Sequence, residues 1–306
     1  MSVKNLEQDS LESFEKKVEV ATTGVVDPPE WVIVPRRAGW EARLREVWRY
    51  RRLTKFFGSR ALQKLYRRTK LGRAWLFIRP LFPLAVRTLI FGGLLGVGSE
   101  GVPYFLFLVA GTTPWELFAS ALMWGTRSLE LNRSLIKQIY VPRLILPISQ
   151  MTPAYLTFFI YMTVLTVAVI AFGIRDGRNY IVFGTGLIWA ALAVVLTVIF
   201  AMGLAFWTSV PAMAARDVRF TLGFILGFWI FLTPILYPLS SVPEQWRIWV
   251  MLNPMAALVE TFKWGLLGIG SLDLVSLTVA VVLIAAVNIT GLMFFIRVEA
   301  DAADKT

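Results

Sequence analysis

The chain has 306 residues, of which 57% are hydrophobic, and a formal net charge of +11. Soluble domains are only about 45–50% apolar, so this composition predicts an integral membrane protein. The sequence contains no cysteine and no histidine, which excludes disulfides, thiol nucleophiles, histidine-bound metals and Ser-His-Asp triads.

The first 30 residues are polar and acidic, with seven carboxylates and three lysines. They lack the basic start and apolar core of a secretory signal. We therefore expect residues 1–30 to form a disordered tail that stays in the cytoplasm.

A basic segment, residues 31–79, follows this tail and contains 15 basic and two acidic residues. Apolar side chains recur within it at helical spacing, which predicts one or two interfacial amphipathic helices along the inner leaflet. Its positive charge is attracted to anionic lipid headgroups rather than to nucleic acid, because it directly precedes the first span. The segment either anchors that span or also contacts the phosphate of a lipid substrate, for which the candidates are Arg67, Arg68 and Arg73.

Six apolar stretches are long enough to cross a bilayer, which requires ~17–25 helical residues. Lys and Arg number 26 in the segments that a cytoplasmic N-terminus would place inside, against four in the outer segments. This bias predicts that both termini are cytoplasmic. The sequence thus predicts an all-α transmembrane domain over 80–297, followed by a cytoplasmic tail over 298–306. The six spans fall near 80–98, 103–124, 147–173, 180–207, 221–238 and 272–296.

Two charged residues interrupt the predicted spans, Arg87 in the first and Glu116 in the second. Counted from the span ends at 1.5 Å per residue, both lie ~10 Å from the inner side of a ~30 Å core. Charged side chains at such depth are costly and usually face a bundle interior or a water-filled path. We expect Arg87 and Glu116 to lie close together, as an ion pair or through a shared water; direct substrate contact is the alternative.

The predicted cytoplasmic loop after the second span carries a regular apolar stripe on a short helix, formed by Leu131, Leu135 and Ile139. Pro142 ends this helix. The helix either lies on the membrane or docks into a groove on another protein. Because the sequence has no G-x-x-x-x-G-K-[ST] motif, the chain cannot bind ATP in a P-loop, and energy for transport, if it is needed, must come from an ion gradient or from a partner.

On the predicted outer side, residues 239–271 are rich in Trp and Leu but are broken by Pro and charges. The stretch from Ser241 to Glu244 has the spacing of a capping box, and Asn253 precedes Pro254 as an N-cap. These signals predict two short helices, over 244–252 and 254–267.

Each of these helices is too short to span, so it re-enters the membrane or lies at its surface. Glu260 and Lys263 are three residues apart and can pair on one helix face. The two helices are either plain surface helices or an exit gate for a substrate.

Five segments in register resemble the membrane permease of ABC-2 type polysaccharide exporters, which move lipid-linked O-antigen, teichoic acid and related glycans. One departure is Ala61, which stands where the family usually has an aspartate. The similar segments are LYRRTKLGRAWLFIRPLF (65–82), GVPYFLFLVAGTTPWELFASAL (101–122), LIKQIYVPRLILP (135–147), ARDVRF (215–220) and FLTPILYPLSSVPEQWRIWVMLNPMAALVETFKWGLLG (231–268).

This resemblance implies two copies of the chain in a bacterial inner membrane, paired with two copies of a separate ABC ATPase that holds ATP and Mg²⁺. The chain itself would carry no cofactor and no metal and would perform no covalent chemistry. Its cargo would be an undecaprenyl-diphosphate-linked or other lipid-linked glycan, moving through an aromatic-lined channel between the two permeases.

The resemblance also assigns roles to particular residues. The coupling helix that docks on the ATPase would comprise Glu130, Leu131, Leu135, Ile136, Lys137, Ile139 and Tyr140. The second cytoplasmic loop would contribute Arg216, Asp217 and Arg219 nearby. The two outer helices, with Trp246, Asn253, Pro254 and Glu260, would line the exit.

Two other functions remain open from the sequence. One is an ABC-2 exporter of drugs or small lipids. The other is a membrane glycosyltransferase or polymerase, which would need carboxylates or basic groups positioned on a sizeable loop. The outer segments offer only scattered carboxylates: Glu100, Asp176, Glu244, Glu260 and Asp273.

Overall fold

The computed structural model describes residues 48–66, 75–136, 138 and 141–303, and this part of the chain is built from helices without any strand. The chain divides into two units, residues 1–38 and 39–306, and the description below concerns the second. The predicted tail and several candidate residues lie outside the described residues. These candidates are Arg67, Arg68, Arg73, Lys137, Ile139 and Tyr140.

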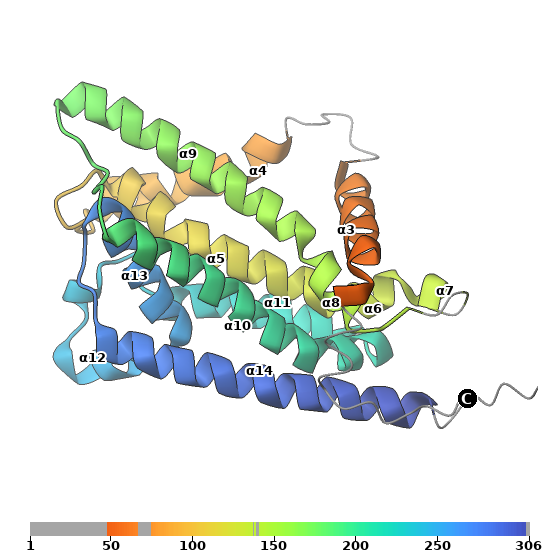
Figure 1. Cartoon of the computed structure of the whole chain (residues 1–306). Helices are drawn as coiled ribbons and strands as arrows, with labels where there is room; N and C mark the ends of the chain where they lie inside the picture. The colour runs from red at the N-terminus through yellow and green to blue at the C-terminus, as the bar shows by residue number, and fades with distance from the viewer. Residues whose placement is uncertain (1–47, 67–74, 137, 139–140, 304–306) are drawn as a thin grey trace, which may run out of the picture. The chain divides into compact units, whose positions relative to one another are not determined.

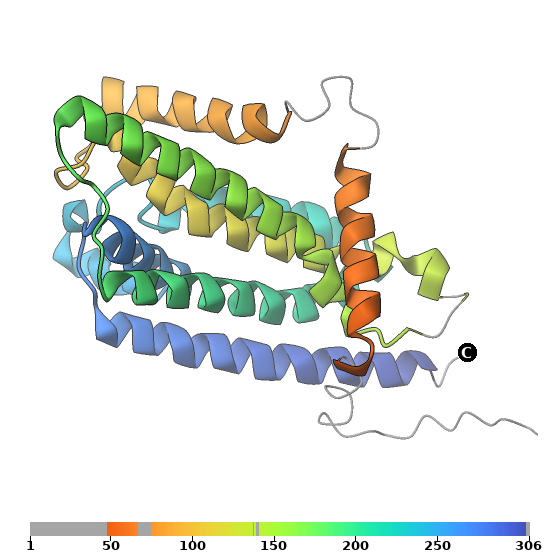
Figure 2. The ribbon, with the colours of Figure 1, turned by 45° about the horizontal axis from the view of Figure 1, so that its top comes forward.

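The predicted basic amphipathic segment contains a helix, α3 (Arg51–Tyr66). On its buried face Phe57 and Ala61 are 1% exposed, and a Cβ on Gly58 would overlap the hydroxyl of Thr152. Its other face exposes basic side chains and Phe56. Figures 1 and 2 show α3 at one end of the bundle, across the direction of the long helices, and we call this the α3 end.

Among the described residues, five helical stretches are long and apolar enough to cross a membrane. The central one is α5 (Tyr104–Thr126). In its most apolar part 78% of the residues are buried, whereas in the first stretch only 11% are. The five stretches are Phe77–Leu94, formed by α4 (Trp75–Arg87) and the π-helix η2 (Thr88–Leu94); α5; Ile145–Asp176, formed by α8 (Ile145–Gln150) and α9 (Thr152–Asp176); α10 (Gly186–Ala214); and Leu274–Val298 of α14 (Leu274–Ala303).

The stretch near 221–238 is a shorter helix than predicted. It consists of the 13-residue α11 (Asp217–Trp229) and the 3₁₀ turn η3 (Ile230–Leu232), and the backbone becomes extended at Thr233. Pro234 follows, and the residue before a proline is disfavoured in a helix. The remaining residues to 238 are apolar but not helical.

The last span runs in the same direction as α10. The amide of Asn288 donates to the carbonyl of Ile199 at 3.0 Å, and a Cβ on Gly291 would lie 2.5 Å from the carbonyl oxygen of Gly203. Further along, the rings of Trp207 and Phe294 stack with their centroids 4.7 Å apart. Since the residue numbers rise together on both helices, α10 and α14 are parallel, and the chain between them must return along the bundle.

That return follows α5 along its whole length. Arg219, at the start of α11, forms an ion pair with Glu130, just beyond the last residue of α5. At the other end, the hydroxyl of Tyr104, the first residue of α5, donates to the carbonyl of Leu236 at 2.8 Å. The segment from Arg219 to Leu236 therefore passes from the α3 end to the opposite end, which Figure 1 shows near α12.

Two short helices lie at this opposite end, as predicted. Helix α13 (Pro254–Leu267) has eleven buried residues and ends at Gly268 in a left-handed conformation. Helix α12 (Glu244–Met251) has none buried. The two predicted helices thus differ sharply in environment, because only α13 packs into the bundle.

The predicted capping box at α12 does not form. Pro243 occupies the N-cap position and no side chain caps the helix. The hydroxyl of Ser241 donates instead to the carbonyl of Pro238 at 2.7 Å, within the 3₁₀ turn η4 (Leu239–Ser241). The prediction failed because this turn uses the serine hydroxyl before the helix begins.

Candidate functional site

The loop that follows α5 is less regular than the single helix expected there. It contains two four-residue helical turns, α6 (Ser128–Leu131) and α7 (Arg133–Ile136). Between them Asn132 is buried, and its side-chain amide donates to the carbonyl of Ser128 at 2.8 Å. An asparagine that bonds to the backbone in this way competes with the helical hydrogen bonds, so the helix is interrupted at this residue.

One residue of the apolar stripe of this loop, Leu135, packs against the chain itself, while Ile139 lies outside the described residues. Leu135 and Ile136 contact an apolar cluster at the α3 end that joins α3, α6, α8, α10 and α14. Arg133, Ser134 and Gln138 are exposed. Among the described residues of the loop, the most exposed side chains are therefore polar, while Leu131, Leu135 and Ile136 are half-buried. The members of this cluster are Phe57, Leu129, Val141, Leu144, Ile145, Leu146, Phe206 and Phe295.

An ion pair connects the two segments that were predicted to lie near the ATPase. Nη1 of Arg219 contacts both carboxylate oxygens of Glu130, at 3.1 and 3.0 Å. Both side chains are partly exposed, 19% for Arg219 and 30% for Glu130. Arg216 and Asp217 are exposed at the start of α11. The ion pair thus connects α6 to α11. Sequence reasoning did not predict this contact, because the two residues are far apart in the sequence.

Charged and phenolic groups also meet within the bundle, between α4, α5 and α9. Glu116 interacts electrostatically with Arg87 and Arg79, and Tyr161 interacts with the same three groups. Within the described part of the chain, no ion pair within 4.0 Å joins Arg87 to Glu116. Their proposed direct or water-mediated pairing remains a prediction.

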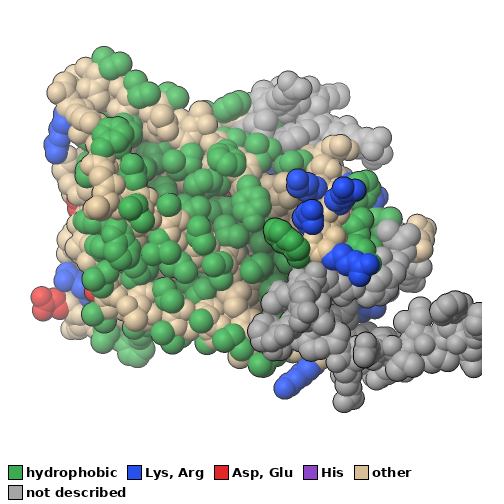
Figure 3. Space-filling model, viewed as in Figure 1, with side chains coloured by type: hydrophobic (Ala, Val, Ile, Leu, Met, Phe, Trp, Pro, Cys, Tyr) green, Lys and Arg blue, Asp and Glu red, His purple; other side chains and the backbone are tan. Residues whose placement is uncertain are grey.

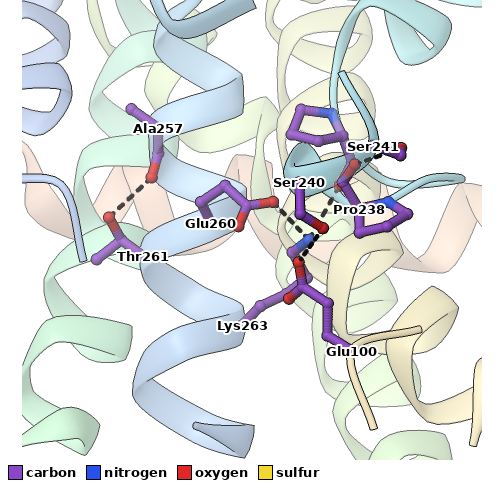
Figure 4. Close-up of polar contacts among 9 residues, drawn as sticks. Glu100, Pro238, Ser240, Ser241, Ala257, Glu260, Thr261 and Lys263 are labelled. Atoms are coloured by element: carbon purple, nitrogen blue, oxygen red, sulfur yellow. Dashed lines mark hydrogen bonds and ion pairs between the residues drawn. The ribbon is translucent and has the colours of Figure 1, made fainter. Parts of the chain in front are cut away.

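A second charged group lies at the opposite end of the bundle, and Figure 4 shows it between α13 and the segment around Pro238. Lys263 is completely buried, and its ammonium nitrogen lies 2.5 Å from Oε1 of Glu260. Another carboxylate, Glu100, accepts a hydrogen bond from the hydroxyl of Ser240 at 3.1 Å. A Cβ on Gly270 would contact both carboxylates, so this glycine permits their close approach.

Burial raises the pKa of the Glu260 carboxyl, the ammonium of Lys263 opposes that rise, and the charge of Glu100 adds to it. Over the residues that the structure describes, no three carboxylates converge to hold a metal ion. Among the described residues, the charge that compensates Glu260 is therefore the ammonium of Lys263, one turn along the same helix.

Residues 230–238 comprise η3 and the non-helical backbone that follows it, and side chains satisfy much of this backbone. We call these residues the break. Non-helical backbone deep in a membrane protein requires such partners, since water is scarce there. Five carbonyls of the break or its edge accept hydrogen bonds: Trp229 from Thr233 (3.1 Å), Phe231 from Tyr237 (2.9 Å), Leu232 from Asn253 (3.3 Å), Pro234 from Lys263 (3.1 Å) and Leu236 from Tyr104 (2.8 Å).

Asn253 has a larger role than the predicted cap. Its Oδ1 accepts from the backbone nitrogen of Met255 at 3.1 Å, which confirms the N-cap of α13. The same oxygen accepts from the indole of Trp229, and its Nδ2 donates to the hydroxyl of Thr233 at 3.0 Å. Asn253 therefore joins the start of α13, where Pro254 is the first residue, to the end of α11. Trp246 on α12 is 58% exposed and is not part of this group.

The aromatic side chains divide into an inner and an outer set. Trp115, Phe118, Phe200 and Trp229 contact one another inside the bundle. Four phenylalanines on one face of α11 and η3 are more than half exposed, and they are Phe220, Phe224, Phe228 and Phe231. The inner set packs the core, whereas these four phenylalanines form an exposed aromatic face that a substrate or a second chain can contact.

Comparison with known proteins finds relatives that are named for O-antigen export or polysialic acid transport. The chain is 25% identical over 222 residues to the O-antigen export system permease protein RfbA of Myxococcus xanthus, covering 72% of this chain and 82% of that protein. It is 28% identical over 207 residues to the RfbA protein of Klebsiella pneumoniae, covering 67% and 76%. It is 23% identical over 202 residues to the polysialic acid transport protein KpsM of Escherichia coli, covering 66% and 76%.

Residues 52–267, from α3 to the end of α13, match the ABC-2 type transporter family. This range includes the Glu130–Arg219 ion pair, the break and the Lys263 group. The chain is an integral membrane protein that belongs to the ABC-2 type transporter family.

Proposed function

We propose that this chain is the permease subunit of an ATP-driven exporter of a cell-surface polysaccharide in a bacterial inner membrane. The observation that carries this proposal is the family match over residues 52–267, together with relatives named for O-antigen export and polysialic acid transport. The chain acts as a transport subunit, and ATP hydrolysis belongs to a separate ABC ATPase. The cargo is a lipid-linked glycan.

The chain crosses the membrane six times, with both termini in the cytoplasm and the α3 end facing inward. The sixth crossing is made jointly by α11, η3 and the break. The parallel course of α10 and α14 supports this arrangement, because a return crossing is needed between them. Figure 3 adds support, since hydrophobic side chains cover the middle of the face while Lys and Arg gather at the α3 end. Helix α13 re-enters from the outer side, and the exposed α12 lies at the surface.

The ATPase docks on the loop that contains α6 and α7, and it meets the polar side of that loop. On the apolar side of the loop, Leu135 and Ile136 pack on the chain's own cluster at the α3 end. Movement of α6 then reaches α11 through the pair of Glu130 and Arg219. The permease halves shift largely as rigid bodies in response to the ATPase.

Two permease chains and two ATPases form the complex, and the glycan passes between the permeases. The exposed phenylalanines of α11 support this path, because the apolar faces of sugar rings can pack on aromatic rings. Arg87 in the first crossing and Glu116 in the second pair with each other, directly or through a shared water, and have a structural role rather than contacting the substrate.

The decisive experiment is co-expression of the chain with its candidate ABC ATPase, purification of the complex and reconstitution into vesicles with a lipid-linked glycan. We expect ATP-dependent movement of the glycan across the bilayer. A complex with an ATPase variant that binds but does not hydrolyse ATP is the matched control. Transport by the purified chain alone under an ion gradient would disprove the proposal.

A further inference from the structure

Lys263 is the most deeply buried charge among the described residues, and its surroundings are unusual. Its side chain is 0% exposed. The ammonium contacts the carboxylate of Glu260 at 2.5 Å and donates to the carbonyl of Pro234 at 3.1 Å. It also lies 4.3 Å from the centroid of the Phe107 ring on α5. One ammonium thus contacts three parts of the chain: α13, α5 and the break.

These contacts have the chemistry of a binding site for a small cation. A buried ammonium is costly unless a carboxylate and further acceptors compensate it. The carboxylate here is joined by a carbonyl just beyond the end of a helix, where the helix dipole favours positive charge. The face of an aromatic ring adds further attraction.

Ion-coupled carriers place a mobile cation at a comparable position. Their broken helices coordinate Na⁺ or H⁺ through unwound carbonyls and the C-terminal ends of half-helices. In this chain the helical backbone of α11 and η3 ends at Leu232, shortly before Pro234, and the cation that meets the carbonyl of Pro234 is covalently attached to α13. A tethered ammonium cannot dissociate, so it holds the broken end without depending on an ion gradient.

We propose that Lys263 is a positioning residue for export, a tethered cation that holds the break against α13 and α5. The relation to export rests on the proposed function, whereas the contacts of the ammonium do not depend on it. Removing the ammonium should free the carbonyl of Pro234 and leave Glu260 beside Glu100 without compensation. The break should then open toward the outer side.

The test uses Lys263→Ala in the complete complex with its ATPase. This change removes the part of the side chain that corresponds to propylammonium, so added propylammonium can refill the space and 1-propanol serves as a neutral control of the same shape. The chain has no cysteine, and a single Ile235→Cys change places a reporter at a completely buried position of the break. A maleimide that cannot cross the membrane is applied from outside.

We expect the reporter to be protected with Lys263 present and to react about tenfold faster, or more, in the Lys263→Ala background, since a hydrogen bond to a charged group is lost. Propylammonium should restore both the protection and glycan export, whereas propanol should restore neither. Equal rescue by the two compounds, or rescue by neither, would overturn the proposal.

A second variant, Lys263→Met, covers the case in which the alanine variant fails to insert. Methionine retains apolar volume but has no charge, so packing alone would leave the reporter protected and export unchanged. That outcome would also overturn the proposal. If the complex with Lys263 intact moves no glycan, the proposed function fails. The labelling results would still show whether the ammonium holds the break against α13 and α5.

Discussion

Neutralising Glu130 should weaken the connection between α6 and α11, because it removes the carboxylate that Arg219 contacts at 3.0 and 3.1 Å. Exposed ion pairs contribute about 0.2–1 kcal/mol. The partial burial of this pair, 19% and 30% exposed, and its two contacts place it near or just above the upper end of that range. A contribution of about 1–2 kcal/mol changes the ratio of joined to separated arrangements roughly 5- to 30-fold.

The assay is a double-mutant cycle with Glu130→Gln, Arg219→Met and both changes together, in vesicles that contain the permease and its ATPase. The quantity measured is glycan exported per ATP hydrolysed. We expect each single change to lower this ratio and the double change to lower it little further, because the same contact is lost. The exposed Arg178→Met, in the segment after α9 and away from the proposed ATPase-docking loop, is the matched control. Independent, additive effects of the two single changes would refute the role of the pair.

Three further predictions concern packing and hydrogen bonding. Gly291→Ala should lower the melting temperature in detergent, because its Cβ would meet the backbone of α10; Gly227→Ala, which has open space around it, should not. Phe57→Ala should release α3 to proteolysis at a cost of about 3–5 kcal/mol in packing, whereas the exposed Phe56→Ala should leave digestion unchanged. Asn253→Ala should destabilise the protein by more than the ~1 kcal/mol of an N-cap, because it also removes the amide that donates to the Leu232 carbonyl. Thermal unfolding measures this loss, and a loss no larger than that of the cap would contradict the wider role of Asn253.

Hydropathy predicted the long helices because their stability in a membrane depends mainly on the length of an apolar run. The five stretches begin and end within a few residues of the predicted spans, except that α10 both begins later, at Gly186, and ends later, at Ala214. The break lies in an equally apolar run, so hydropathy could not reveal it. Its stability depends on Tyr104, Asn253 and Lys263, which are distant in sequence or lie on another element.

The apolar stripe of the α6–α7 loop shows a different limit of sequence reasoning. An amphipathic pattern indicates that one face is buried, but it does not identify what covers that face. Leu135 was interpreted as a contact for a partner, which stays a prediction; the half-buried side chain also packs on the chain's own cluster at the α3 end. A charge at Leu135 should therefore disturb the permease itself, and the exposed Arg133 is the better position for probing a partner.

Helix α11 is held at each end by polar contacts that belong to different candidate sites. At its start Arg219 contacts Glu130 of α6, and at its end the indole of Trp229 donates to Asn253 at the start of α13. A helix transmits displacement along its axis because its backbone hydrogen bonds are continuous. The ion pair and Asn253 therefore connect the proposed ATPase-docking loop to the proposed exit helix through one element. If α11 acts in this way, Glu130→Gln should alter maleimide labelling at Ile235→Cys, at the far end of the crossing, during ATP hydrolysis. Labelling that is the same with and without Glu130 would show that the two ends move independently.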